Sequence, residues 1–149
     1  MVRHARPDDV GALVELRAEM FRAMGSVTED DRWRAGAFDW FVSRLDDSDY
    51  GIFVVEHHGV VVACAMGAVR DAAPSPASPD GRSVLISNVC TAPDERGNGF
   101  GRRAFEAVMV WARRTGVARA ELTATPSGAG IYRRHGFVTN AFPAMRATL

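Results

Sequence analysis

A glycine-rich segment lies between an apolar stretch and an amphipathic one, and it restricts the possible folds more than any other feature of the sequence. Residues 83–91 are typical of a buried strand, and residues 102–115 of a helix with one apolar face. The first N–H groups of a helix lack intrahelical partners, and glycines let an anion approach the backbone closely. The segment therefore predicts a diphosphate-binding loop, and its sequence is Asp94-Glu95-Arg96-Gly97-Asn98-Gly99-Phe100-Gly101-Arg102.

Other classes of glycine loop fit the sequence less well. Residues 99–104 match the G-x-G-x-x-A pattern of dinucleotide-binding folds. However, residues 92–96 separate the predicted strand from the glycines, and too little chain follows for a doubly wound sheet. A Walker-type loop needs a Lys, and the sequence contains none. A glycine turn without a ligand is the remaining alternative, but the helix start and the flanking Arg96 and Arg102, which can add charge-assisted contacts, favour an anion site.

The hydrophobic pattern predicts one α/β domain over residues 1–149, because a chain of this length can bury one core but not two. The proline-rich residues 71–82 predict an irregular surface loop. Thr28 is expected to cap the second helix. Helices are expected at residues 6–24, 28–45, 102–115 and 126–134. Strands are expected at residues 2–5, 52–56, 60–69, 83–91, 117–125, from 136 onward and at 145–149.

Composition disfavours several kinds of partner. The 18 arginines balance 18 acidic residues, so a net charge of zero gives no reason to expect nucleic acid or an anionic membrane surface. Cys64 and Cys90 lie in apolar runs and are expected to be reduced, buried thiols. His57 and His58 fall in a predicted turn without a third ligand nearby, so no metal site is predicted. Because no apolar run resembles a leader or a membrane span, a cytoplasmic location is expected.

Two blocks of the sequence resemble the GCN5-related N-acetyltransferase (GNAT) superfamily. Residues 88–101 resemble its acetyl-CoA motif, with Arg96, Gly99 and Gly101 on the R-x-x-G-x-G pattern. Residues 131–137 resemble its Tyr and Gly-Phe signature. The resemblance implies a mixed, mostly antiparallel sheet of six to seven strands with splayed central strands and about four helices. It also implies acetyl-CoA as co-substrate, no metal, and a homodimer as a possible assembly.

The resemblance also implies where the cofactor would lie. Pantetheine would run beside the strand of residues 88–91, so the cofactor-binding residues of this strand would be Val89, Cys90 and Thr91. Thr125 corresponds to a position where many members carry an Asn that contacts coenzyme A, and Thr is shorter. The pyrophosphate would lie on the backbone of Arg96, Gly97, Asn98, Gly99, Gly101 and Arg102.

Transfer of an acyl group from a thioester to an amine needs a neutral amine, a stabilised oxyanion and a protonated leaving thiolate. By analogy with the family, the N–H of Val89 is the oxyanion donor and Tyr132 is the acid toward the sulfur and a cofactor contact. The alternative for Tyr132 is aromatic packing under the Gly-Phe turn. No carboxylate lies on the strand itself, so a water chain is one alternative for the base. The acidic candidates, which also suit helix caps, are Glu29, Asp30, Asp31 and Asp39, and His135 is expected on a helix surface.

The expected acceptor is the primary amine of a small molecule. In the family, specificity comes from the segment between the first helices and from strand-joining loops, here residues 20–41 and 71–82. The alternatives are a peptide or protein N-terminus as acceptor, and a non-catalytic acyl-CoA-binding sensor. A tRNA-directed toxin would use the same fold, but the neutral charge disfavours it. Residues that could line an acceptor pocket, or pack in the core instead, are Met20, Phe21, Met24, Trp33, Phe38 and Trp40.

Overall fold

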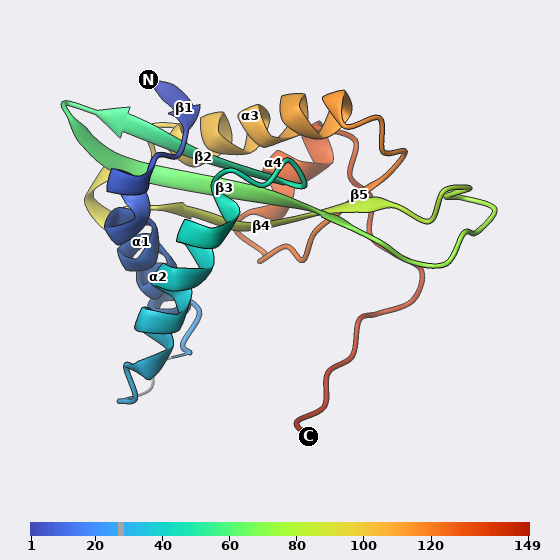
Figure 1. Cartoon of the computed structure of the whole chain (residues 1–149), viewed down its shortest axis with the longest axis horizontal. Helices are drawn as coiled ribbons and strands as arrows, with labels where there is room; N and C mark the ends of the chain where they lie inside the picture. The colour runs from blue at the N-terminus through green and yellow to red at the C-terminus, as the bar shows by residue number, and fades with distance from the viewer. Residues whose placement is uncertain (27–28) are drawn as a thin grey trace.

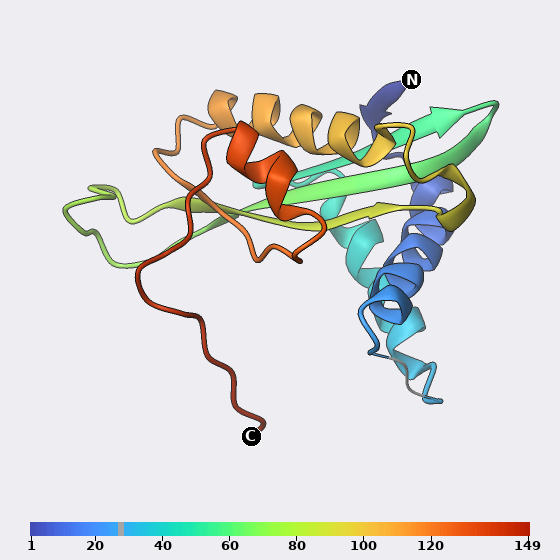
Figure 2. The ribbon, with the colours of Figure 1, turned by 180° about the vertical axis from the view of Figure 1, so that it is seen from behind.

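The structure, a computed structural model, describes residues 1–26 and 29–149 and contains one twisted sheet with helices on both faces (Figures 1 and 2). The strands follow the order β1-β2-β3-β4-β5. All neighbours are antiparallel except β4 and β5, which are parallel. The expected mixed α/β class is therefore confirmed, with five strands in place of six or seven. The strands are β1 (Val2–His4), β2 (Tyr50–His57), β3 (Val60–Arg70), β4 (Ser83–Thr91) and β5 (Ala120–Glu121).

The helices divide between the two faces of the sheet. One face carries α1 (Val10–Ala23) and α2 (Arg32–Arg44), and the other carries α3 (Phe100–Arg114) and α4 (Ala129–Arg134) (Figures 1 and 2). Short 3-10 turns, η1 (Pro7–Asp9) and η2 (Pro93–Glu95), precede α1 and α3. Thr28, the expected cap of α2, lies outside the described residues, and Asp31 occupies the N-cap position.

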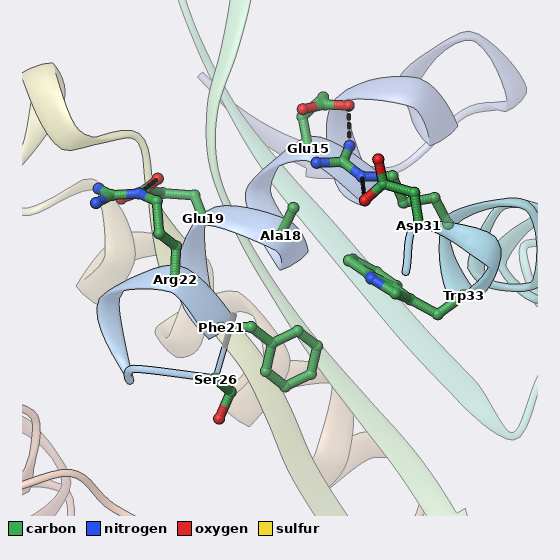
Figure 3. A pocket seen from close by; sticks show the side chains of 9 residues that line it. Glu15, Ala18, Glu19, Phe21, Arg22, Ser26, Asp31 and Trp33 are labelled. Carbon is green, nitrogen blue, oxygen red and sulfur yellow. Dashed lines mark hydrogen bonds and ion pairs between the residues drawn. The ribbon is translucent and has the colours of Figure 1, made fainter. Parts of the chain in front are cut away.

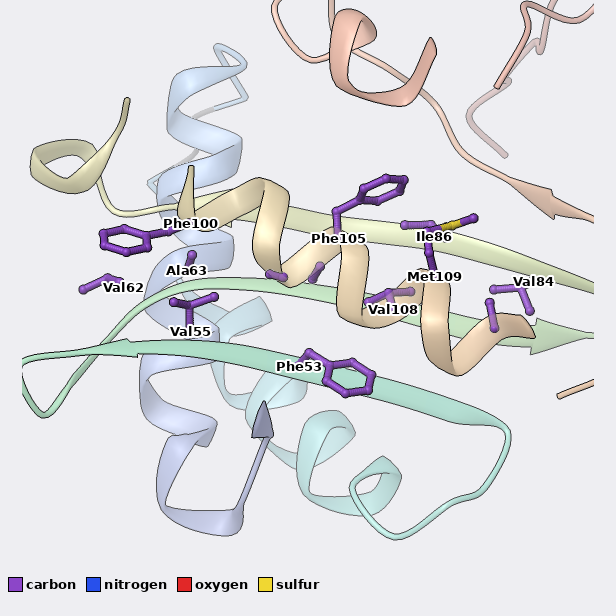
Figure 4. Close-up of a cluster of buried hydrophobic side chains, with 13 residues drawn as sticks. Phe53, Val55, Val62, Ala63, Val84, Ile86, Phe100, Phe105, Val108 and Met109 are labelled. Carbon is purple, nitrogen blue, oxygen red and sulfur yellow. The ribbon is translucent and has the colours of Figure 1, made fainter. Parts of the chain in front are cut away.

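Strand periodicity builds a separate apolar cluster on each face. Along β2, Phe53 and Val55 point toward α3, whereas Ile52 and Val54 point toward α1 and α2. This alternation follows from the two-residue period of a strand. The α3 cluster includes the fully buried Phe105 (Figure 4). The apolar face predicted for residues 102–115 is the face of α3 that covers the sheet.

The last part of the chain departs from the predicted pattern. The strand expected at 117–125 is reduced to Ala120–Glu121, and no strand forms within residues 136–149, all of which the structure describes. A strand gains stability only by pairing, and two residues of β5 offer too short an edge for a further strand. Residues 138–149 are instead exposed and run away from the sheet (Figure 1). Helix boundaries shift as well, since α3 begins at Phe100 and α4 at Ala129.

Candidate functional site

An opening in the sheet lies along one edge of β4. β4 and β5 pair at two positions only, Val84 with Ala120 and Leu85 with Glu121. From Ile86 to Thr91, β4 has no strand partner on this side within the part of the chain that the structure describes. Strand backbone that lacks a neighbour offers N–H and C=O groups to an extended ligand. β4 and β5, which separate after two paired positions, are the splayed central strands that the family resemblance implied.

A β-bulge interrupts β4 in the middle of this edge. The register passes from Cys64 opposite Cys90 to Met66 opposite Ser87, so β4 contains one residue more than β3 over this span. The extra residue lies at Asn88, which is buried and has a φ of +56°. A bulge takes backbone groups out of the ladder and re-aims the following residue. The following residue is Val89, which packs on the α3 side of the sheet.

Hydrogen bonds hold Asn88 in this unusual conformation. Arg17 on α1 donates from Nη1 to the Asn88 side-chain oxygen at 3.0 Å. The Asn88 amide donates to the sulfur of Cys64 at 3.4 Å, and the Cys64 thiol donates to the backbone oxygen of Asn88 at 3.3 Å. Burial raises the pKa of Cys64, so the thiol stays protonated and can donate. The bulge is thus fixed from both α1 and β3.

The glycine-rich segment forms the start of α3. Gly97 and Gly99 have φ values of +84° and +78°, which favour glycine. Gly99 is the N-cap residue, and the first helical bond runs from the N–H of Arg103 to the oxygen of Gly99. The N–H groups of Phe100, Gly101 and Arg102 therefore have no acceptor within the helix. Three donors at the positive end of a 15-residue helix form an anion-binding geometry.

The helix start and the open edge of β4 converge. A Cβ atom on Gly101 would lie 2.8 Å from the side-chain oxygen of Thr91, the last residue of β4. Only glycine permits this approach, so Gly101 serves packing, whereas Gly97 and Gly99 serve backbone conformation. One extended ligand with an anionic end could therefore contact both the β4 backbone and the three free N–H groups.

Several predicted site residues have protein partners in the structure. Arg96 donates to Glu19 on α1 at 3.2 Å, and Arg102 forms a 3.8 Å ion pair with Glu106. The side-chain amide of Asn98 donates to the backbone oxygen of Glu95. The Cys90 thiol donates to the Leu16 oxygen at 2.9 Å, and burial raises its pKa to about 11. Because the Cys90 side chain points toward α1, only its backbone faces the opening.

Thr125 and Tyr132 lie beside one another near the opening. A Cβ on Gly128 would lie 3.4 Å from the Thr125 hydroxyl and 3.7 Å from the Tyr132 hydroxyl. The Tyr132 ring packs edge-on against Phe105, with 5.1 Å between the ring centroids. Its hydroxyl has no hydrogen-bond partner among the described residues, and burial raises its pKa. Tyr132 thus combines the packing role and a free donor.

The acids considered as a base do not gather at the bulge. Asp30 pairs with Arg32 and Asp31 with Arg34, both at the exposed start of α2. Glu29 and Asp39 are exposed. His135 contacts Glu106 and the Ile131 oxygen, on the α3 and α4 side. In the described ranges, no three His, Cys, Asp or Glu residues are placed to hold a metal ion, and no helix is long and apolar enough to cross a membrane.

A pocket of about 470 Å³ lies between α1 and the start of α2 (Figure 3). Of the predicted apolar lining, Phe21 and Trp33 face it, with ring centroids 5.8 Å apart. Phe38 lines a neighbouring hollow, Met20 and Trp40 pack on the core, and Met24 is exposed. The remaining lining is mostly charged and consists of Glu15, Ala18, Glu19, Arg22, Ser26, Asp31 and Arg34.

The roles of three residues of the site could not be assigned from the sequence. Arg17 and Glu19 lie on α1, where a charged residue looks like any other exposed helical position. Asn88 was visible only as the first residue of a motif, because an apolar strand pattern hides a bulge. A polar Asn within that pattern was the single available hint.

Comparisons with known proteins agree with this geometry. Residues 11–137 match the family described as Acetyltransferase (GNAT) family. A predicted acetyltransferase from Clostridium acetobutylicum, solved with acetyl-CoA, is 23% identical, with a TM-score of 0.85 over 98% of this chain and 95% of that one. A GCN5-related N-acetyltransferase from Ralstonia eutropha is 28% identical, with a TM-score of 0.79 over 99% and 97%. Glucosamine-6-phosphate N-acetyltransferase from Arabidopsis thaliana is 18% identical, with a TM-score of 0.77 over 99% and 97%. No curated protein matches the sequence.

Proposed function

Because the chain belongs to the acetyltransferase (GNAT) family, we propose that it transfers the acetyl group of acetyl-CoA directly to the primary amine of a small molecule. The observation that carries this proposal is the convergence at Thr91 and Gly101 of an unpaired strand edge with three free N–H groups. Acetyl-CoA has the matching parts, since pantetheine carries amide groups and its far end carries a pyrophosphate.

The proposed cofactor contacts follow the open edge from β4 to α3. The backbone of Val89, Cys90 and Thr91 would bind pantetheine as a neighbouring strand would. The pyrophosphate would lie at the loop formed by Arg96, Gly97, Asn98, Gly99, Gly101 and Arg102, where positive φ angles and the helix start support it. Arg96 and Arg102 would add charge to the same anion from their exposed positions. Thr125 would reach coenzyme A from the α4 side.

The proposed chemistry uses backbone and hydroxyl donors. Attack of the neutral amine on the thioester carbonyl forms a tetrahedral oxyanion, which the N–H of Val89 would stabilise after the bulge. Collapse of the intermediate releases a thiolate, and the free hydroxyl of Tyr132 would donate its proton to that sulfur, while the proton that the nitrogen loses on forming the amide restores the phenol through water. The amine has a pKa of about 10.4 in solution and must lose a proton before it attacks. A water chain would accept this proton, since Asp30 and Asp31, just before α2, form exposed ion pairs.

The pocket between α1 and α2 supports a small acceptor. Its volume of about 470 Å³ is in the range of small-molecule sites. Two aromatic rings and several charges line it, which suits an amine better than a long apolar acyl chain. A peptide or protein N-terminus as acceptor, and a sensor that binds acetyl-CoA without turnover, are separated from this function by the experiment below.

We also propose a homodimer in the cytoplasm. Residues 138–149 carry exposed apolar side chains, among them Val138, Phe142 and Met145, and all three of these are at least 86% exposed. In addition, β5 leaves an edge of the sheet without a neighbour in the described chain. Packing of this segment against a second copy would cover both features.

The test of the function combines calorimetric binding of acetyl-CoA with thiol release across amines, amino acids and short peptides. Binding with release for small amines supports the proposal. Release with peptides alone would move the acceptor to an N-terminus, and binding without any release would identify a sensor. Absence of acetyl-CoA binding would contradict the cofactor assignment itself.

A further inference from the structure

Arg17 is an isolated cation beside the bulge of β4. It is partly buried on α1, and burial lowers the pKa of its guanidinium. Its protein contacts are the bond to Asn88 and the ring of Phe21, which lies 4.8 Å from the guanidinium carbon. No acidic side chain forms an ion pair with it in residues 1–26 and 29–149. A guanidinium remains charged at physiological pH, so Arg17 places an unbalanced positive charge in a partly desolvated position.

The other arginines of the described chain are balanced or hydrated. Nine of them form ion pairs with acids: Arg3, Arg22, Arg32, Arg34, Arg70, Arg82, Arg96, Arg102 and Arg119. Most of the rest are exposed. Arg44 is the other partly buried arginine without an acid, and it stacks on Trp40 and Tyr50. Arg17 differs from Arg44 because it lies at the proposed reaction centre.

The free edge of Arg17 has the geometry of a carboxylate site. Nη1 is used by Asn88, which leaves Nε and Nη2 as a pair of parallel donors. Neither of these two atoms has a hydrogen-bond partner in the described chain. Every enclosed polar side-chain atom there does have one, so Nε and Nη2 must both be open to solvent. The Nε and Nη2 edge binds a carboxylate through two parallel bonds. A solvent-accessible, two-donor edge with no counter-ion is therefore available to a ligand.

The position of this edge limits how far the acid can be from the reacting amine. Asn88 directly precedes Val89, whose N–H would stabilise the oxyanion, so Arg17 is anchored one residue from the proposed point of attack. Phe21 extends the surface from Arg17 to the pocket between α1 and α2, because its ring contacts both. An acceptor with its side chain in that pocket would present an acid to Arg17 and a nearby amine to the thioester.

We propose that Arg17 binds the carboxylate of the acceptor, so that the substrate is an amine with a carboxylate close to it, as in a free α-amino acid. This inference rests on the proposed function and specifies its acceptor. Arg17 also holds Asn88, and this positioning role alone would affect all acceptors equally. Selectivity for the acid is therefore the property that tests the proposal.

The experiment compares each of the twenty proteinogenic amino acids with its carboxamide, which keeps the amine and removes the negative charge. Thiol release from acetyl-CoA gives kcat/KM for both members of each pair. In the wild-type protein we expect at least one pair in which the acid is preferred by roughly 10-fold to 100-fold, as expected for a charge-assisted bidentate contact. In Arg17→Gln this preference should fall to near unity, because KM for the acid rises relative to KM for the carboxamide, while any effect of releasing Asn88 lowers kcat/KM for both members of a pair alike.

Two further variants keep the result interpretable. Arg17→Lys retains the charge without the two-donor edge and should retain only part of the preference. Arg44→Gln removes the other partly buried arginine that has no acidic partner, and it should leave the preference for the acid over the carboxamide unchanged. The melting temperature of each variant shows whether it is folded, and its acetyl-CoA affinity shows whether it still binds the co-substrate.

The outcomes distinguish the role of Arg17 from the proposed acetyltransferase function on which it rests. Turnover of carboxamides as fast as acids, or a preference that survives Arg17→Gln, overturns the role of Arg17 and leaves the acetyltransferase in place. The role of Arg17 is also overturned if the protein binds acetyl-CoA but no amino acid either causes thiol release or binds in calorimetry. Failure to bind acetyl-CoA overturns both.

Discussion

At the scale of single residues, the candidate site depends on backbone groups that a few side chains hold in place. Asn88 adopts a left-handed conformation inside a strand, which costs conformational energy that its contacts with Arg17 and Cys64 offset. Tyr132 is the clearest exception, because its hydroxyl is free while its ring is packed. Its contribution can therefore be separated from its packing by removal of one oxygen atom.

Tyr132→Phe should lower turnover by roughly 10²-fold, the low end for a positioned proton donor, with little change in acetyl-CoA affinity. The ring contact with Phe105 is retained, so the melting temperature should stay near that of the wild type. Because burial raises the pKa of this hydroxyl, its ionisation should not limit wild-type turnover below about pH 10. Steady-state kinetics across pH measure both effects. Tyr50→Phe is the control, and unchanged turnover in Tyr132→Phe would remove Tyr132 from the mechanism.

At the scale of elements, the site is formed where α3 begins beside the end of β4. Gly101 allows this approach. Trp111 secures the other end of the helix on Gly51 and Gly67, where a Cβ at either position would overlap the indole ring. Gly51 and Gly67 face each other across β2 and β3. Helix α3 is therefore seated at both ends by glycines, which fixes the direction of its free N–H groups.

Gly101→Ala should weaken acetyl-CoA binding by about 10-fold, since the new methyl group displaces the helix start from Thr91. Thr91→Ala removes the atom that the methyl group would meet and keeps the β4 backbone. The double variant should therefore recover most of the lost affinity. Calorimetry of the wild type and the three variants gives the four corners of the cycle. Wild-type affinity in Gly101→Ala, or no recovery in the double variant, would show that the ligand does not use this convergence.

The elements were predictable where local pattern decides structure. The apolar face of α3, the alternation along β2 and the glycine loop all follow from residue spacing, and each forms as expected. The bulge at Asn88 depends on its contact with Arg17 of α1, which lies 71 residues earlier in the chain. Failure of the C-terminal strands likewise depends on how little of β5 pairs. Such long-range terms leave no periodic signal in the sequence.

At the scale of the whole molecule, an ion cluster ties the N-terminus to the sheet. Arg3 on β1 donates to Asp9 at 2.6 Å and to Glu56 on β2 at 2.8 Å. Asp9 is buried and also accepts the N–H of Arg6. The cluster thus joins β1, the turn before α1 and β2, and it fixes the base of the helix that carries Arg17 and Glu19.

Asp9→Asn should destabilise the fold by about 3 kcal/mol, because it removes the more buried of the two carboxylates that pair with Arg3 and leaves Glu56 alone to balance that charge. The hydrogen bond from Arg3 lowers the pKa of Asp9 in the folded state. A lowered pKa means that its stabilisation is present above the unfolded value near 3.9 and is lost as pH falls through the folded value. Urea unfolding should show a constant difference between pH 5 and 7 that shrinks below about pH 4. The exposed Asp46→Asn serves as control, and a difference independent of pH would refute the assignment.

The C-terminal segment tests the assembly of the whole protein. Residues 138–149 are exposed and add little to the core of one chain, so their deletion should not lower the stability of a monomer. If they cover the open side of β5 in a second copy, the full chain should sediment as a dimer and the chain ending at Phe137 as a monomer. Thermal unfolding of the full chain should then depend on protein concentration, whereas that of the truncated chain should not. Phe142→Asp is the matched point variant, since it places a charge in the proposed interface without shortening the chain. A full-length chain that sediments as a monomer would contradict the dimer, and the exposed apolar side chains would then need another partner.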